Sequence, residues 1–94
     1  MLAFASCTKT YQVGEIVRTN QECLSAINKQ CYDEMTRYSV NRNGVAISLM
    51  VSSGDVHVLP SYTRGKVADI GVGMYQVDFD GYGKLWVASE FIED

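Results

Sequence analysis

The stretch Arg64–Glu93, RGKVADIGVGMYQVDFDGYGKLWVASEFIE, decides the fold of this chain. It contains three runs in which apolar and polar residues alternate, at 65–70, 74–79 and 84–88. Glycine-containing turns separate these runs at 71–73 and 80–83. Alternation at period two between such turns indicates an antiparallel meander with one buried face. We expect a short turn and a last strand residue to follow, with Phe91 or Ile92 filling the end of the curled sheet.

Length and composition indicate one folded domain over residues 1–94. The chain has 94 residues, 47% of them hydrophobic, and a single proline, which is typical of a small globular protein rather than a disordered one. A chain of this size builds one core and leaves little room for a deep cleft between domains.

The negative charge is concentrated in the last third. Residues 1–63 hold five acidic and five basic residues, whereas residues 64–94 hold six acidic residues against three basic ones, for a net charge of −3. Because this third would repel a phosphate backbone, nucleic acid is not expected as a partner.

The three cysteines, Cys7, Cys23 and Cys31, are odd in number and irregularly spaced. This pattern argues against a disulfide framework and favours a reducing compartment, so we expect a cytoplasmic protein. No apolar run approaches the length of about 20 residues that a membrane helix needs. Cys23 and Cys31 form no C-x-x-C pair, so no metal site is expected, and no cofactor is implied.

Residues 1–10 have no clear period and are expected to form a loose arm or a short edge strand. The first convincing strand is residues 11–18, with a bulge or twist near Gly14. Thr19 and Glu22 then match a capping box, which predicts an amphipathic helix from about residue 20 to about residue 33.

Asn43-Gly44 is the strongest hairpin turn signal in the chain. It predicts a hairpin that joins residues 36–41 to residues 45–51, although residues 34–41 fit either helix or strand. A further turn at 52–55 leads into a strand at 56–59, which Pro60 ends. The predicted fold is therefore mainly β (α+β by count), a small antiparallel barrel with an inserted amphipathic helix and hairpin at residues 20–59.

The order of these segments resembles the SH3-like small barrels, which include many bacterial proteins of unknown function, some encoded in mobile integron cassettes. The resemblance is carried by Val13–Arg18, Arg64–Val67, Tyr75–Phe79, Gly83–Val87 and Phe91–Ile92. It covers under half of the chain.

Two families within this group are similar to the last third. The glycine-then-hydrophobic segment at 64–70 is similar to KOW-type RNA-binding barrels, but the basic surface of those modules is missing here. The last third also looks like the type II dihydrofolate reductases. The positions that match their catalytic Val-Gln-Ile-Tyr are Leu85-Trp86-Val87-Ala88, so the shape is expected to carry over and the reductase chemistry is not.

Trp86 is the most informative candidate residue. If Leu85 and Val87 face the core, Trp86 points to the outer face together with Gln76 and Asp78. An exposed tryptophan there would suggest an interface with another subunit or a ligand platform. In the alternative, the inserted helix packs over this face and Trp86 joins a second core layer.

Other candidate sites are weaker. Tyr62, Tyr75 and Tyr82 could form an aromatic groove for a proline-rich peptide, although alternation places Tyr75 in the core. His57 could pair with a cysteine, but with Val56 and Val58 inward it would face solvent or a helix. Asp78 and Asp80 could act as paired carboxylates only within a cleft, and a solvated position beside the turn is more common.

No catalytic residue is assigned, and we expect a binding protein rather than an enzyme. The first hypothesis is an SH3-like barrel that self-associates through the outer face that includes Trp86, with Gln76, Asp78, Tyr62 and Tyr82 as further ligand or interface candidates. The second is a protein that binds or converts a small molecule in a pocket formed between subunits. The third, nucleic-acid binding, is opposed by the charge.

Overall fold

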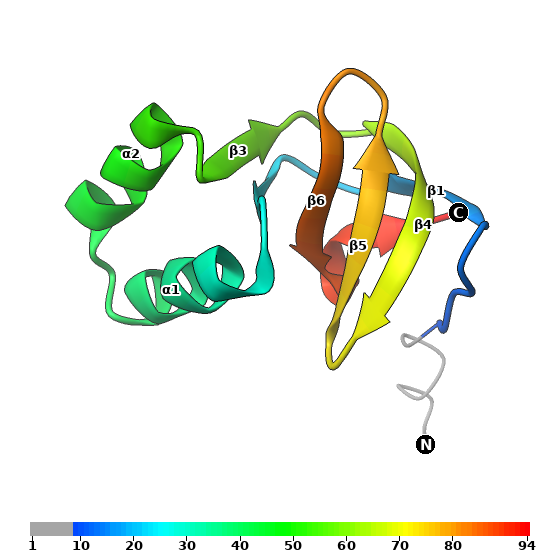
Figure 1. Ribbon diagram of the computed structural model, residues 1–94, viewed down its shortest axis with the longest axis horizontal. Helices are drawn as coiled ribbons and strands as arrows, with labels where there is room; N and C mark the ends of the chain where they lie inside the picture. Colours follow the sequence, from blue (N-terminus) through cyan, green and yellow to red (C-terminus); the bar gives the residue numbers. More distant parts are fainter. Residues whose placement is uncertain (1–8) are drawn as a thin grey trace.

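The computed structural model describes residues 9–94, and within them the chain forms a curled antiparallel half-barrel with two helices beside it (Figure 1). The elements are β1 (Ile16–Thr19), β2 (Cys23–Ala26), α1 (Lys29–Val40), α2 (Gly44–Ser53), β3 (Val56–Leu59), β4 (Arg64–Gly71), β5 (Met74–Phe79), β6 (Gly83–Ala88), the 3-10 turn η2 (Ser89–Phe91) and β7 (Ile92–Glu93). The seven strands follow the order β3-β2-β6-β5-β4-β1-β7. The predicted fold class, mainly β with α+β character, is confirmed.

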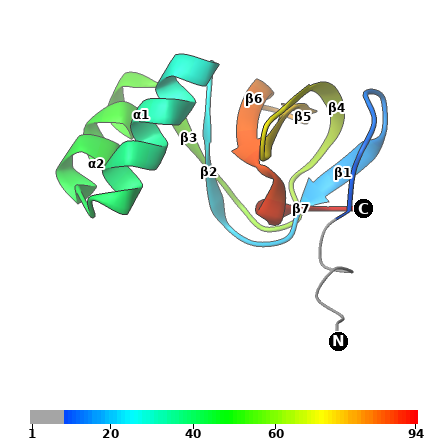
Figure 2. The same cartoon turned by 90° about the horizontal axis from the view of Figure 1, so that it is seen from below.

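The sheet curls without closing, so that β3 and β7 remain its two edges (Figure 2). This half-barrel is compatible with an SH3-like fold. Neither described helix has the length and apolar character needed to cross a membrane.

The meander β4–β5–β6 matches the prediction closely. In register, Val67 lies opposite Val77, and Val77 lies opposite Leu85. All three side chains are buried, and Phe79 and Val87 join them in the same core. The alternation read from the sequence therefore selects the face that packs.

Gly65 allows β4 and β5 to approach closely. A Cβ at this position would lie 2.6 Å from the carbonyl oxygen of Asp78 and 2.6 Å from Cγ1 of Val77. Both are closer than side-chain atoms tolerate, so a larger residue here would push the two strands apart.

The first strand is shorter than predicted. Residues 11–15 are not in a strand, because the chain turns at Gly14, whose φ is +97°. The amide of Gly14 donates to the carbonyl of Val67, and the amide of Tyr11 donates to the hydroxyl of Tyr75. Only residues 16–19 pair, with β4 on one side and β7 on the other. The predicted arm at 1–10 lies almost wholly outside the described residues.

The helix predicted at 20–33 is wrong except at residues 29–33, which begin α1. Residues 23–26 form strand β2, which pairs with β3 and meets β6 at Ala26 and Trp86. Helix α1 starts later, and its N-cap is Asn28, whose side-chain oxygen accepts from the amide of Cys31. The capping box does not form, because Thr19 is already engaged by other partners.

The predicted β-hairpin at 36–51 is also wrong, because both of its arms are helical. Asn43 is the N-cap of α2 and accepts from the amide of Ala46 at 3.1 Å. Asparagine favours helix N-caps as well as hairpin turns, so the signal had two interpretations. The apolar residues at 45–51 do not share one buried face: Met50 is buried, whereas Val45 and Leu49 are exposed.

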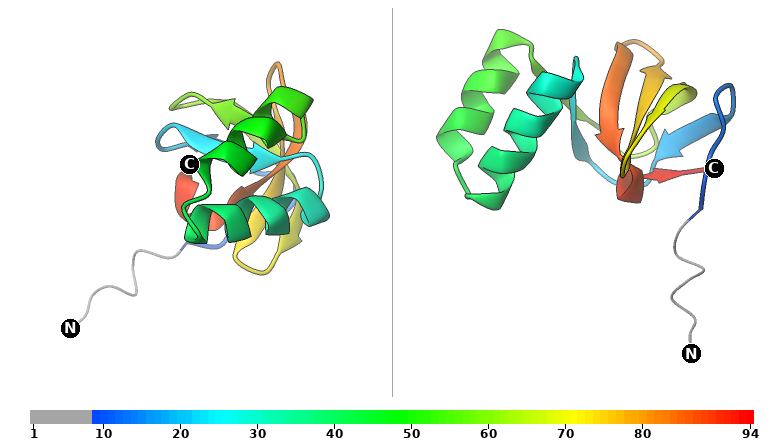
Figure 3. Two further views of the ribbon diagram at one scale, coloured as in Figure 1. Left: turned by 90° about the vertical axis from the view of Figure 1, so that its left-hand side faces the viewer. Right: turned by 60° about the horizontal axis from the view of Figure 1, so that its bottom comes forward.

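The inserted segment is therefore a helical hairpin held between two paired strands. Strand β3 and its end at Pro60 follow the prediction, although Val58 is exposed and Val56 pairs with Ala26 in the interior. Met35 from α1 and Met50 from α2 pack on these two residues as a second, smaller core. Figure 3 shows both helices in front of one side of the half-barrel.

Thr19 joins the two ends of this insertion. Its side chain is fully buried; the hydroxyl donates to the carbonyl of Pro60 at 2.7 Å and accepts from the amide of Thr63 at 2.9 Å. Its backbone amide donates to the carbonyl of Thr63, and its carbonyl accepts from the amide of Tyr62. The segment that leaves β1 is thus bonded to the segment that enters β4.

Replacing Thr19 by valine, which keeps the shape and removes the hydroxyl, should lower the free energy of unfolding by about 1–3 kcal/mol, because polar partners of that hydroxyl stay buried without it. Urea denaturation measures the change. The exposed Thr36→Val on α1 is the matched control and should change stability by less than about 0.5 kcal/mol. Equal effects of the two variants would contradict the role given to Thr19.

Candidate functional site

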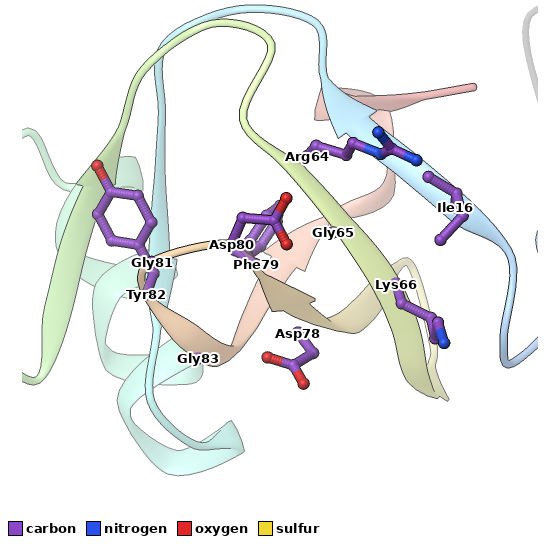
Figure 4. Close-up of a pocket in the computed structure, with 10 residues that line it drawn as sticks. All are labelled: Ile16, Arg64, Gly65, Lys66, Asp78, Phe79, Asp80, Gly81, Tyr82 and Gly83. Carbon is purple, nitrogen blue, oxygen red and sulfur yellow. The ribbon is translucent and has the colours of Figure 1, made fainter.

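An open cleft of about 680 Å³ lies where β4 begins and β5 ends (Figure 4). Arg64 and Lys66 line it from β4, Asp78 from β5, and Asp80 and Tyr82 from the β5–β6 turn. The structure thus brings three of the sequence candidates, Asp78, Asp80 and Tyr82, to one cleft.

The charges on this part of the sheet pair across the strands. Asp78 lies in register between Lys66 on β4 and Lys84 on β6, so an acidic residue has a basic neighbour on each side. Opposite charges at such positions stabilise sheet pairing. Asp80 contributes its backbone amide to a hydrogen bond with the carbonyl of Arg64. Both carboxylates are exposed, and the basic neighbours of Asp78 on both strands suit strand pairing better than acid–base chemistry.

Trp86 is covered within the single chain, with an exposed fraction of 5%. Its strand neighbours are Gln76 on β5 and Ala26 on β2. The ammonium of Lys29, the first residue of α1, lies 4.9 Å from the centre of its ring. The structure therefore shows the alternative in which the insertion packs over Trp86, and Gln76 beside it is half-buried.

The three candidate tyrosines occupy separate places. Tyr62 is 62% exposed, has a left-handed backbone with φ of +64°, and stacks under the guanidinium of Arg18 at 4.9 Å. Tyr82 packs edge-on against His57 with ring centres 6.4 Å apart. Tyr75 is buried, as alternation predicts, so the aromatic groove does not form from these three residues.

Cys23 and Cys31 are both free thiols, in different cores. Cys23 is buried in the main core, and this burial raises its pKa to about 11. Burial also raises the pKa of Cys31, with a further contribution from Asp55. His57 lies opposite Ser25 in the strand register. Between residues 9 and 94, no three or more His, Cys, Asp or Glu side chains come together in a group that could hold a metal ion.

The outer face of α2 is a surface that the sequence interpretation missed. Helix α2 and its cap, residues 44–54, contain no charged residue, yet Val45 is 74% exposed and Leu49 is 66% exposed. These two side chains are one helical turn apart and lie on the same face. Val40, at the end of α1, is 76% exposed. The sequence does contain a signal for this surface, which is the absence of charged residues from 43 to 54. It indicates an apolar surface only when the segment is known to be helical.

A second missed feature is an apolar groove of about 540 Å³ between α1 and the end of the half-barrel. Tyr32, Met35 and Ser39 form one wall, at the three- and four-residue spacing of a single helix face. Leu24 and Phe91 form part of the opposite wall.

Comparison with protein-family models, with curated proteins and with solved structures found no match for this chain. What the protein does is therefore inferred from its own surface chemistry.

Native Cys23 should resist alkylation, because a pKa of about 11 leaves only about one thiol in a thousand ionised at pH 8. In a Cys7→Ser background, iodoacetamide should modify the half-buried Cys31 first and reach Cys23 only when denaturant is added. Peptide mass mapping over time measures both rates. Equal rates at the two cysteines in the native protein would contradict the burial of Cys23.

The same shift predicts a pH dependence. Because the folded-state pKa of Cys23 lies above the ordinary value of 9.0, the contribution of this thiol to the free energy of unfolding should be constant below pH 9 and be lost as pH rises toward 11. A Cys23→Ala variant is the control, and its stability should lose this component of the decline.

Proposed function

We propose that this chain is a non-enzymatic binding protein that works as a homo-oligomer, with the outer face of α2 as the surface on which two copies meet. The observation that carries the proposal is the exposure of Val45 and Leu49 on a helix without charges. Exposed apolar residues that adjoin on a surface without charges make a candidate interaction site.

A second copy is the occupant that the charge distribution favours. The chain carries a net charge of −3, so two copies repel each other weakly on average. In a two-fold contact each residue meets the same patch on its partner. Helix α2 itself holds no ionised group to repel or to desolvate, and the carboxylates beside it are Glu34 and Asp55, which line a hollow with Leu49.

This interface replaces the one built on Trp86, whose ring is covered by Lys29 and the adjacent strands. The half-barrel then serves as the frame that presents α2, and its cleft with Arg64 and Asp78 remains open for a further protein or small-molecule ligand. Nucleic acid stays disfavoured by the acidic last third.

We also propose kinship with the SH3-like small barrels of bacteria, including those carried in integron cassettes. The order of β1, a long excursion, β4–β5–β6, η2 and β7 supports this relation. A cytoplasmic location is proposed with it, and the free thiols of Cys23 and Cys31 support a reducing compartment.

Sedimentation velocity over a wide range of concentration tests the assembly. The wild-type protein should show at least twice the mass of a single chain, and Val45→Glu should raise the dissociation constant about 100-fold or more, because an unpaired carboxylate would be buried. Position 45 lies in the first turn of α2, where a carboxylate suits the helix dipole, so the fold should be kept.

Val72→Glu is the matched control, since Val72 is 98% exposed in the β4–β5 turn and far from α2 in the fold. It should leave the mass unchanged. Trp86 emission should stay at short wavelength in both variants and at every dilution, because one chain covers the ring. A wild-type monomer at all concentrations, or equal dissociation by both variants, would refute the proposal.

A further inference from the structure

The groove between α1 and the half-barrel has the size and lining of a small-molecule site. Its volume of about 540 Å³ lies within the range of ligand pockets. Tyr32 and Met35 from α1 face Leu24 of β2 and Phe91 of η2 across it, so its walls are mostly aromatic and aliphatic. It is formed within one chain and does not depend on the α2 interface.

Among the residues that line this groove, only two carry a charge at neutral pH, and both are glutamates. Glu22 lies just before β2, and Glu90 lies in η2. No lysine, arginine or histidine is among the lining residues, in contrast to the cleft at Arg64 and Lys66. The negative charge of the groove is therefore not neutralised by its own walls.

The charge of Glu90 also affects Tyr32, which lines the groove. Burial raises the pKa of Tyr32, and the carboxylate of Glu90 raises it further. Asn20 fixes the backbone at Glu90. Its side-chain amide donates to the backbone carbonyl of Glu90, and its backbone amide donates to the backbone carbonyl of Phe91. These bonds use only backbone carbonyls, so the exposed carboxylate of Glu90 remains available on the same groove as Tyr32.

We propose that this groove binds a lipophilic organic cation. The cationic centre would lie near Glu22 and Glu90, and the phenol ring of Tyr32 would add a cation–π contact. The apolar body would lie along Met35, Leu24 and Phe91. A metal ion fits poorly, because two exposed carboxylates against aliphatic walls do not supply the ligand number that hard cations require.

Tetraphenylphosphonium and tetraphenylborate are the probes, because they share one shape and carry opposite charges. Isothermal titration calorimetry should show saturable binding of the phosphonium and none of the borate. Binding should weaken as salt is added, since part of the attraction is between exposed charges. Equal binding of the two ions would overturn the proposal, because it would show that the groove recognises apolar surface and not positive charge.

The double variant Glu22→Gln/Glu90→Gln removes both carboxylates and should raise the dissociation constant of the phosphonium about 5- to 30-fold. Glu15→Gln/Asp69→Asn makes the same change in net charge at two exposed carboxylates that line neither this groove nor the cleft at Arg64, and it is the control, which should change affinity less than about 2-fold. Equal losses in the two double variants, or none in the first, would overturn the proposal.

Titrating the phosphonium into Val45→Glu separates this site from the proposed assembly. If the groove belongs to one chain, the dissociated variant should bind with unchanged affinity. Loss of binding on dissociation would overturn the assignment of the groove to a single chain.

Discussion

The buried hydroxyl of Thr19 is the constraint on which the rest of the structure depends. With Pro60 and Thr63 it closes the base of an excursion that runs from the end of β1 to the start of β4. A polar group buried this completely is stable only when its donors and acceptors are paired. Because Thr19 finds both partners far along the chain, the insertion must leave and return at one point beside the sheet.

That closure explains why the insertion extends the sheet and does not hang from it as a free loop. Once its ends are joined, β2 and β3 can pair with each other, and β2 reaches β6 at Ala26 and Trp86. The helices then rest on the outer side of that pair, with Met35 and Met50 over Ala26 and Val56. Lys29 is brought over Trp86 by the same arrangement, which removes the ring from solvent.

The sequence predicts the meander well because its signals are local. Alternation from residue 65 to residue 88 specifies both the strands and the buried face, and the glycines specify the turns. The insertion was predicted poorly because each of its short sequence motifs is compatible with two different local structures. Thr19 and Glu22 fit a helix cap, and Asn43-Gly44 fits a hairpin, yet Thr19 bonds to Pro60 and Asn43 caps a helix. Distant contacts decided between these alternatives, and no local pattern records them.

The candidate surfaces follow the same division. The sequence pointed to candidate residues mainly on the meander, such as Trp86 and Asp78, because only there does the pattern predict which side chains face outward. In the structure Trp86 is buried and Asp78 lies in register between two lysines, whereas the exposed apolar face lies on α2 and the acidic groove has α1 as one wall. Neither follows from a local pattern: Val45 is a surface residue only if 44–53 is a helix, and Glu22 and Glu90 line one groove because Asn20 bonds to the backbone of Glu90 and Phe91. The half-barrel fixes where the insertion begins and ends, and the insertion supplies the surfaces available for binding.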